Sequence, residues 1–108
     1  MVRWEQVVGF QWDEGNARKS ADKHGVTQAE AEQVFIGEPL LVVRDEGHSG
    51  NEERFHALGA THAGRRLHIA FTLRLEGTLI RVISARDMHR KERAIYAGHQ
   101  ARATQAGS

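Results

Sequence analysis

Cysteine is absent from this chain of 108 residues, and long apolar runs are absent as well. Without cysteine the chain can form no disulfide framework, no thiolate nucleophile and no cysteine-ligated zinc site. No apolar run approaches the roughly 18 residues that a membrane span needs, and the amino terminus lacks the basic-then-apolar layout of a signal peptide. We therefore expect a cytoplasmic protein that does not bind membranes.

Metal-binding motifs are also missing. The chain has seven histidines but no His-Glu-x-x-His motif, and pairs such as His48 and His56 fall on different predicted elements. We expect no metal ion and no other cofactor. No internal repeat is visible, and the length suits one domain with one modest core. We expect that domain over residues 1–100 and a disordered tail over residues 101–108, where no core-forming pattern remains.

Acidic and basic side chains are segregated along the chain, although the net charge is only +1. Residues 13–53 contain ten acidic and four basic side chains, a net charge of −6, whereas residues 65–93 contain eight basic and three acidic ones, a net charge of +5. This asymmetry favours a polyanionic partner for the second half. The alternative is a solvated surface on which the arginines pair with the acidic half.

The amino-terminal part of the chain predicts a short strand and then a helix. The apolar and aromatic residues 7–12 are suited to the strand. Asp13 is a good N-cap for a helix over Glu14–His24, because its carboxylate can accept from the free amides of the first turn. Gly25 can take the left-handed conformation that ends this helix.

A second helix is predicted directly after the first. Thr27 and Glu30 have the spacing of a capping box, in which each side chain satisfies the backbone donor of the other. The helix would begin at Thr27 and end before Gly37 and Pro39. Its buried stripe follows the i, i+3, i+4 pattern and consists of Ala31, Val34 and Phe35.

The middle of the chain predicts an antiparallel sheet. Apolar or alternating runs cover residues 40–44, 53–60, 66–73 and 78–84, and a polar loop over residues 45–51 separates the first run from the second. The two later connections are short enough for hairpins, so a meander is the simplest arrangement. The alternation in the last two runs predicts that one face of the sheet packs on helices and the other forms a polar floor.

A third helix is expected after the sheet. Either Ser84 or Asp87 can cap it, and it would run to about Gly98 with Ile95 and Met88 as apolar anchors. Together these elements predict an α+β fold with two short N-terminal helices, an antiparallel β-meander sheet and a C-terminal helix.

Basic side chains are concentrated in residues 79–93, where the last strand gives way to this helix. Arg81 interrupts an apolar strand, where an unpaired charge is costly. Arginine suits an anion site because its planar fork holds two phosphate oxygens at once and stays charged. The alternative for Arg81 is an ion pair with Glu53 or Glu92 that only joins the sheet to a helix.

A set of short motifs lies between residues 10 and 98 in a characteristic order. The motifs are Phe10-Gln11-Trp12-Asp13, Lys23-His24-Gly25-Val26, Glu30-Ala31, Val34-Phe35, Pro39, His48-Ser49, Glu52-Glu53-Arg54, Gly64-Arg65, Thr72 with Arg74, Ile80-Arg81-Val82-Ile83-Ser84-Ala85-Arg86, and Glu92-Arg93 with Tyr96. This ordered set resembles the BrnT toxins of bacterial type II toxin–antitoxin systems. Two positions depart from that pattern, since Asn16 stands where a lysine is common and Ser20 where an asparagine is common.

The resemblance implies a RelE-like ribonuclease fold and an RNA-cleaving toxin that blocks translation. It also implies a cognate antitoxin that binds the toxin and carries a DNA-binding domain, and therefore contact with operator DNA through the antitoxin. We expect the antitoxin to cover or approach the face that carries Arg81 and Arg86, with binding that weakens as salt rises.

RNA can be cut without a metal ion when the ribose 2′-hydroxyl attacks the adjacent phosphorus. The reaction needs a base for the hydroxyl proton, cations for the anionic phosphorane and an acid for the leaving 5′ oxygen. The candidate catalytic residues are Arg74, Arg81, His24, Glu53 and Glu92. The candidate RNA-binding residues are Lys23, Arg54, Arg65, Arg86 and Arg90.

Several of these candidates have a purely structural alternative. An exposed Arg74 beside a turn needs no functional explanation, so the resemblance alone singles it out. His24 can transfer protons near neutral pH, or it can simply cap the helix that it ends. Glu53 and Glu92 can be bases or salt-bridge partners of neighbouring arginines. The other histidines have weaker arguments than His24.

Two functions of different classes remain open from the sequence. The first is a metal-independent endoribonuclease toxin. The second is a catalytically inactive module that binds its antitoxin and contributes to transcriptional autoregulation. RNA cleavage in the presence of a chelator, with Arg81→Ala as the diagnostic variant, would separate them.

Overall fold

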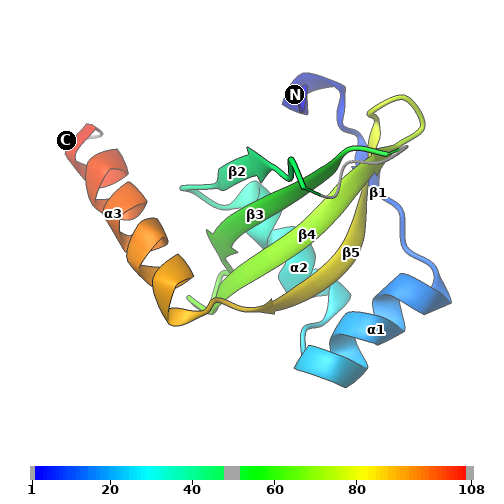
Figure 1. The fold of residues 1–108 in the computed structure, drawn as a ribbon, viewed down its shortest axis with the longest axis horizontal. Helices are drawn as coiled ribbons and strands as arrows, with labels where there is room; N and C mark the ends of the chain where they lie inside the picture. Colours follow the sequence, from blue (N-terminus) through cyan, green and yellow to red (C-terminus); the bar gives the residue numbers. More distant parts are fainter. Residues whose placement is uncertain (1, 48–51, 107–108) are drawn as a thin grey trace.

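Figure 1 shows the computed structural model, which describes residues 2–47 and 52–106. His48 lies outside these residues. The elements follow in the order η1 (Trp4–Gln6), β1 (Gly9–Phe10), α1 (Glu14–His24), α2 (Gln28–Ile36), β2 (Leu41–Arg44), β3 (Arg54–Ala60), β4 (Arg66–Arg74), β5 (Leu79–Asp87) and α3 (Arg90–Ala106). The predicted α+β class is confirmed, with three α-helices and one five-stranded sheet in the described ranges. None of the described helices has the length and apolar character that crossing a bilayer requires.

The sheet is mixed, which corrects the prediction of an entirely antiparallel meander. Its strand order is β1-β5-β4-β3-β2, and β2 to β5 pair antiparallel with their sequence neighbours. β1 instead lies parallel to β5, with Gly9 opposite Leu79 and Phe10 opposite Ile80. The predicted hairpins give β5 a partner strand on only one edge. The free backbone groups of the other edge can pair with another extended segment, and here that segment is β1.

The first helical turn, η1, is an element that no sequence pattern predicted. Its Trp4 ring lies 6.2 Å from the Phe35 ring and 6.4 Å from the Phe71 ring, measured between centroids. An aromatic ring at this position extends the apolar core. η1 therefore covers one end of the core.

The predicted ends of α1 are confirmed. The Asp13 carboxylate accepts from the Asn16 amide at 3.0 Å, and the Asn16 side-chain oxygen accepts from the Asp13 amide at 2.7 Å. Gly25 ends the helix with a positive φ of 65°, which a residue with a Cβ resists. The capping box of Thr27 and Glu30 is also present at the start of α2.

Two buried polar side chains attach α1 to the outer edge of β5. The Asn16 amide donates to the Val82 carbonyl at 3.1 Å, and the Ser20 hydroxyl accepts from the Ala85 amide at 2.9 Å. These are the two positions that depart from the common motif pattern. In this chain both satisfy backbone groups of β5 that lie beyond its pairing with the two-residue strand β1.

The main core lies between the sheet and α2, and Figure 1 shows α2 behind β3 and β4. Its buried residues on the sheet come from alternate positions of β3, of β4 and of β5 as far as Val82, as the predicted period of two requires. They include Phe55, Ala57, Leu67, Ile69, Phe71, Ile80, Val82 and Ala85. The face of β4 opposite this core carries His68 and Thr72, as predicted for a polar floor. The prediction is confirmed only in part, because Leu58 and Ala60 of β3 form a second apolar cluster with Met88 and Tyr96 on that side.

The carboxy-terminal boundary between strand and helix differs from the prediction. β5 continues to Asp87 and α3 begins at Arg90, so neither Ser84 nor Asp87 caps the helix. The backbone pairing with β4 carries the strand further, because His68 lies opposite Arg86 and Leu67 opposite Asp87. α3 extends to Ala106, beyond the expected end at Gly98.

The apolar anchor of α3 is Tyr96 rather than Ile95. Tyr96 is 1% exposed and its hydroxyl donates to the Pro39 carbonyl at 2.9 Å, whereas Ile95 is 47% exposed. A tyrosine can be buried at this place because its polar end finds an acceptor. Met88, the second predicted anchor, is buried beside it.

Candidate functional site

The face of the sheet turned away from α1 and α2, which we call the open face, gathers basic side chains from three strands. Strand pairing puts Arg54 and Arg81 opposite Thr72 on its two sides, and it puts Arg86 opposite His68. Arg74 follows Thr72 by two residues and shares its face. The open face therefore brings together four of the predicted arginines: Arg54, Arg74, Arg81 and Arg86.

A β-bulge decides that Arg81 and Arg86 share one face. Five positions separate them, and in a regular strand an odd separation puts two side chains on opposite faces. The register between β4 and β5 shifts at Ala70 and Phe71, so that Ala70 pairs with Ser84 and Phe71 with Val82. Ile83 is the extra residue, and such a bulge reverses the alternation beyond it.

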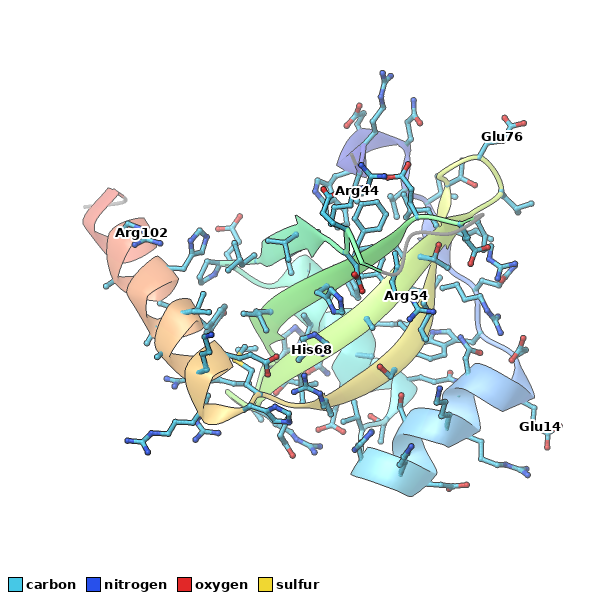
Figure 2. All side chains as sticks on the ribbon, in the orientation of Figure 1. Glu14, Arg44, Arg54, His68, Glu76 and Arg102 are labelled. Carbon is cyan, nitrogen blue, oxygen red and sulfur yellow. The ribbon has the colours of Figure 1, made fainter. Side chains whose placement is uncertain are left out.

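Arg54 has no ion-pair partner among the residues that the structure describes. It is half-buried at the start of β3, opposite Thr72. Figure 2 labels Arg54 and His68 on the side of the sheet away from α2. An unpaired guanidinium on a partly shielded surface is available for a phosphate without first losing a carboxylate.

Arg81 is paired, but with neither of the predicted partners. Its guanidinium lies 2.9 Å from an Asp13 carboxylate oxygen and donates to the Gln11 side-chain oxygen at 3.3 Å. The pKa of Asp13 is lowered, first by its hydrogen bond from the Asn16 amide and next by Arg81. Asp13 is therefore ionised and holds Arg81 at the edge of the open face beside α1.

Arg74 and Arg86 are also held by carboxylates. Arg74 lies 3.2 Å from Glu52 at the exposed end of the face. Arg86 makes two hydrogen bonds to Glu92 of α3, at 2.8 and 3.0 Å. The Arg86 hydrogen bonds are the main reason why the pKa of Glu92 falls to about 2. While it is bound to Arg86, Glu92 is a weak base.

Two histidines with weak sequence arguments occupy the centre of the open face. His56 lies between the Asp45 carboxylate, 2.8 Å from its Nε2, and the His68 ring, whose Nε2 is 2.9 Å from its Nδ1. Burial, and after it the positive charge of Arg86, lowers the pKa of His68 to about 4. His68 is therefore neutral at pH 7.

A groove of about 420 Å³ lies between this face and α3. His56, His68, Arg86 and Glu92 form its polar part. Its walls are aliphatic and consist of Leu41, Val43, Leu58 and Ile95. The groove therefore combines cationic, proton-accepting and apolar surfaces in one place.

A larger groove of about 750 Å³ lies between the N-terminal segment and the end of α2. Its lining is almost entirely apolar, with Glu38 as the one titratable side chain. Larger size does not make it the better site, because it lacks the groups that phosphate chemistry needs.

Arg65 lies outside the open-face cluster and is fully engaged. Its guanidinium binds Asp87 at 2.8 Å and Glu30 at 3.1 Å, and it donates to the carbonyls of Gly25 at 2.9 Å and His24 at 3.2 Å. These contacts, of which that with Asp87 is the strongest, raise the pKa of Arg65 further above its usual value. Arg65 thus ties the end of α1 and the start of α2 to the end of β5.

The remaining predicted residues are not brought into the cluster. His24 ends α1, and its charge lowers the pKa of Asp87 slightly, which puts it near the Arg65 contacts. Lys23 and Arg90 are exposed at the ends of α1 and α3. Glu53 pairs with Arg44 at 3.2 Å at the edge strand β2.

Sequence reasoning missed the pair of histidines and their carboxylate. Counting the pairing of β3 and β4 from their short hairpin would have put His56 and His68 on one face, in adjacent rows. Asp45 lay in the predicted loop and gave no such signal. No group of three or more potential ligands in the described parts of the chain could hold a metal ion.

Residues 12–92 match the model of a family described as the ribonuclease toxin BrnT of type II toxin–antitoxin systems. The match includes every open-face arginine and the Asp45, His56 and His68 cluster. No protein in the curated collection matches the chain.

Proposed function

Because the chain belongs to the BrnT family of ribonuclease toxins from type II toxin–antitoxin systems, we propose that it is an endoribonuclease that cleaves RNA without a metal ion and so inhibits translation. The observation that carries this proposal is the convergence of Arg54, Arg81 and Arg86 on one face of the sheet. We also propose that the fold is RelE-like, on the basis of the antiparallel β2 to β5 sheet with a C-terminal helix at its open face.

Arg54 and Arg81 are the residues that we assign to the phosphate. They flank Thr72 from the two neighbouring strands, which puts their backbones about 10 Å apart. Arginine side chains from both sides can meet over Thr72, where a phosphodiester can lie between them. Two guanidinium groups stabilise the extra negative charge of the phosphorane because they keep their charge and their geometry throughout the reaction.

Binding of RNA requires that carboxylates leave some of these arginines. Asp13 holds Arg81 and Glu92 holds Arg86. A phosphate that replaces either carboxylate restores a charge-assisted pair, so the exchange loses little net interaction. The carboxylates keep the arginines in place and in the correct orientation before RNA arrives.

The candidates for proton transfer have unequal support. Glu92 is next to the proposed phosphate site but is a weak base while Arg86 binds it. Glu53 pairs with Arg44 away from the open face, and His24 lies near Asp87 at the end of α1. We keep Glu92 as the nearest carboxylate, and we expect Glu53 and His24 to contribute through charge and packing.

The test is cleavage of a defined RNA by purified protein in the presence of a chelator. We expect wild-type cleavage to persist, and we expect Arg54→Ala and Arg81→Ala each to reduce kcat/KM by roughly 100-fold or more, as for loss of one transition-state donor. The matched control is Arg18→Ala, because Arg18 makes an exposed pair with Glu14 on α1. Metal-dependent cleavage, or variants as active as the control, would contradict the proposal.

A second function has one observation in its favour. Three of the four open-face arginines are already paired with Glu52, Asp13 and Glu92, which suits a surface built for association rather than catalysis. The protein would then be an inactive toxin module that acts in autoregulation, with operator DNA contacted through its antitoxin. Absence of cleavage by the wild-type protein under every condition would favour this function.

Membership of a type II toxin family implies a cognate antitoxin. We propose that the antitoxin, which would carry a DNA-binding domain, covers the Arg81 and Arg86 region with acidic side chains and so competes with RNA. Association through charged side chains speeds up encounter and weakens with added salt. Titration calorimetry between about 50 and 500 mM salt, a range chosen to shorten the Debye length severalfold, checks this; an unchanged Kd would contradict it.

A further inference from the structure

The hydrogen bonds of the open face fix where the protons of its two histidines lie. His56 Nε2 is 2.8 Å from an Asp45 carboxylate oxygen, and an ionised carboxylate only accepts. His56 Nε2 therefore carries a proton, and in the tautomer with no second ring proton His56 accepts at Nδ1. His68 lies 2.9 Å from that nitrogen and must donate through its own Nε2.

This assignment leaves a lone pair on His68 Nδ1. That nitrogen is buried and has no hydrogen-bond partner in the described part of the chain. Buried polar atoms are nearly always paired, so an exception calls for an explanation. The ring as a whole is 8% exposed, and its pKa of about 4 keeps it neutral at pH 7.

His68 lies four residues along β4 from Thr72, at the end of the open face where Arg86 supplies the cation. Arg86 lies opposite His68 across the β4–β5 pairing, and both line the groove with Glu92. The groove is about 420 Å³ in volume, within the range of small-molecule sites, and its aliphatic walls suit the apolar faces of a ribose and a base. The charged groups that face His68 come from every neighbouring element: Asp45 and His56, Arg86, and Glu92 of α3.

We propose that His68 is the general base of this site, with His56 and Asp45 as the residues that position it. This inference rests on the ribonuclease function proposed above. An RNA phosphate that takes Arg86 from Glu92 breaks the Arg86–Glu92 pair, which would uncover the buried His68 Nδ1 and bring the ribose into the groove. His68 Nδ1 can then reach the 2′-hydroxyl.

The step needs no metal ion and no redox partner. His68 Nδ1 takes the proton of the 2′-hydroxyl while the 2′ oxygen forms a bond to phosphorus. The bond from phosphorus to the 5′ oxygen breaks, water gives the leaving oxygen its proton, and the hydroxide that remains takes the proton from His68. The products are a 2′,3′-cyclic phosphate and a 5′-hydroxyl end. The positive charge that forms on His68 is stabilised through His56 by the Asp45 carboxylate, as in other relays of a carboxylate and an imidazole.

The deciding variant is His68→Gln. The glutamine amide can donate to His56 as Nε2 does, but it cannot take a proton. We expect kcat to fall by about 10²- to 10⁴-fold, the usual contribution of a general base, with KM changed little. The acidic limb of the kcat/KM profile against pH should disappear. The matched control is His62→Gln, because the His62 side chain is exposed in the hairpin between β3 and β4; it should behave as wild type.

Asp45→Asn tests the positioning role. The amide keeps the shape of the carboxylate but removes its charge and can reverse the proton assignment of His56. We expect a lower kcat with an unchanged KM, and a shifted acidic limb. A structural role alone would change stability and leave the pH profile of the folded enzyme in place.

The outcomes separate this inference from the proposed function. If wild type cleaves RNA and His68→Gln cleaves as well as His62→Gln, the base assignment is wrong and the ribonuclease proposal stands. If wild type cleaves nothing, both are wrong. If His68→Gln does not fold, the wild-type pH profile decides, because a profile without an acidic limb overturns the assignment of a histidine base.

Discussion

Arg54 and Arg65 show how differently two arginines of one chain can be used. Arg54 has no ion-pair partner in the described ranges and faces the open side of the sheet. Arg65 binds two carboxylates and two carbonyl groups across the ends of three elements. The sequence offered both as RNA-binding residues, since their difference is one of surroundings and not of residue type.

Arg65→Ala should destabilise the fold without removing a phosphate contact. The variant leaves Asp87 and Glu30 without their cation, and we expect a loss of about 1–3 kcal/mol in the free energy of unfolding. Urea titration followed by circular dichroism measures this, with Arg18→Ala as the exposed-pair control that should lose under about 1 kcal/mol. A stable Arg65→Ala protein that no longer binds RNA would instead favour a direct contact.

Glu92→Gln tests the role of the carboxylate that holds Arg86. Removing its charge frees Arg86, so we expect RNA to bind several-fold more tightly while the fold loses about 1–2 kcal/mol. Fluorescence anisotropy with a labelled RNA and urea titration measure the two effects. A fall in kcat of about 100-fold or more would show that Glu92 itself transfers a proton.

At the scale of elements, β5 positions the site because its two edges contact different elements, and its two faces carry core residues and open-face arginines. β4 pairs with one edge, and β1 and α1 share the other. The bulge at Ile83 turns Arg86 to the face of Arg81 while Val82 and Ala85 both remain in the core. The strand thus serves the core and the open face at the same time.

Ser20→Ala should weaken the contact between α1 and β5. The buried Ala85 amide would lose its acceptor, and an unsatisfied buried donor costs about 1–3 kcal/mol. Thermal and urea unfolding measure the loss. The matched control is Ser84→Ala, because the Ser84 hydroxyl makes no hydrogen bond within the described residues; equal stability of the two variants would contradict this explanation.

At the scale of the whole molecule, the folded state holds several groups in forms that bind fewer protons than the unfolded chain does. The pKa of His68 falls from 6.5 to about 4 and that of Glu92 from 4.5 to about 2. The pKa values of Asp13, Glu30 and Asp87 are also lowered. Stability rises with pH wherever the unfolded state binds more protons. The protein should therefore be sensitive to acid.

His68 determines the loss of folding stability at the higher end of the acidic pH range. Its contribution is complete above pH 6.5 and is lost as the pH falls from 6.5 towards 4, because the unfolded histidine becomes charged first. We expect the free energy of unfolding to drop by about 1–3 kcal/mol between pH 7 and pH 4.5, and His68→Gln to remove much of that drop. Urea titrations at the two pH values check this. An unchanged slope in His68→Gln, with His62→Gln as control, would contradict it.

Local signals in the sequence were enough for much of the fold. The caps at Asp13, Gly25 and Thr27 were predicted because hydrogen bonds within one turn decide them. The strands of the meander were found to within a few residues, since burial of alternate positions leaves a pattern with a period of two. Where long-range backbone pairing decided the outcome, as at the end of β5 and the parallel β1, the prediction was wrong.

By itself, the sequence determined the α+β class, the polar residues on one face of β4, and the family, whose model matches residues 12–92. Only the tertiary structure decided which charged groups meet. The bulge that unites Arg81 with Arg86, the pairing of Arg81 with Asp13, and the chain from Asp45 through His56 to His68 all join residues from different elements. Such contacts depend on strand register and on the competition between partners, and neither is visible in the spacing of residues along one chain.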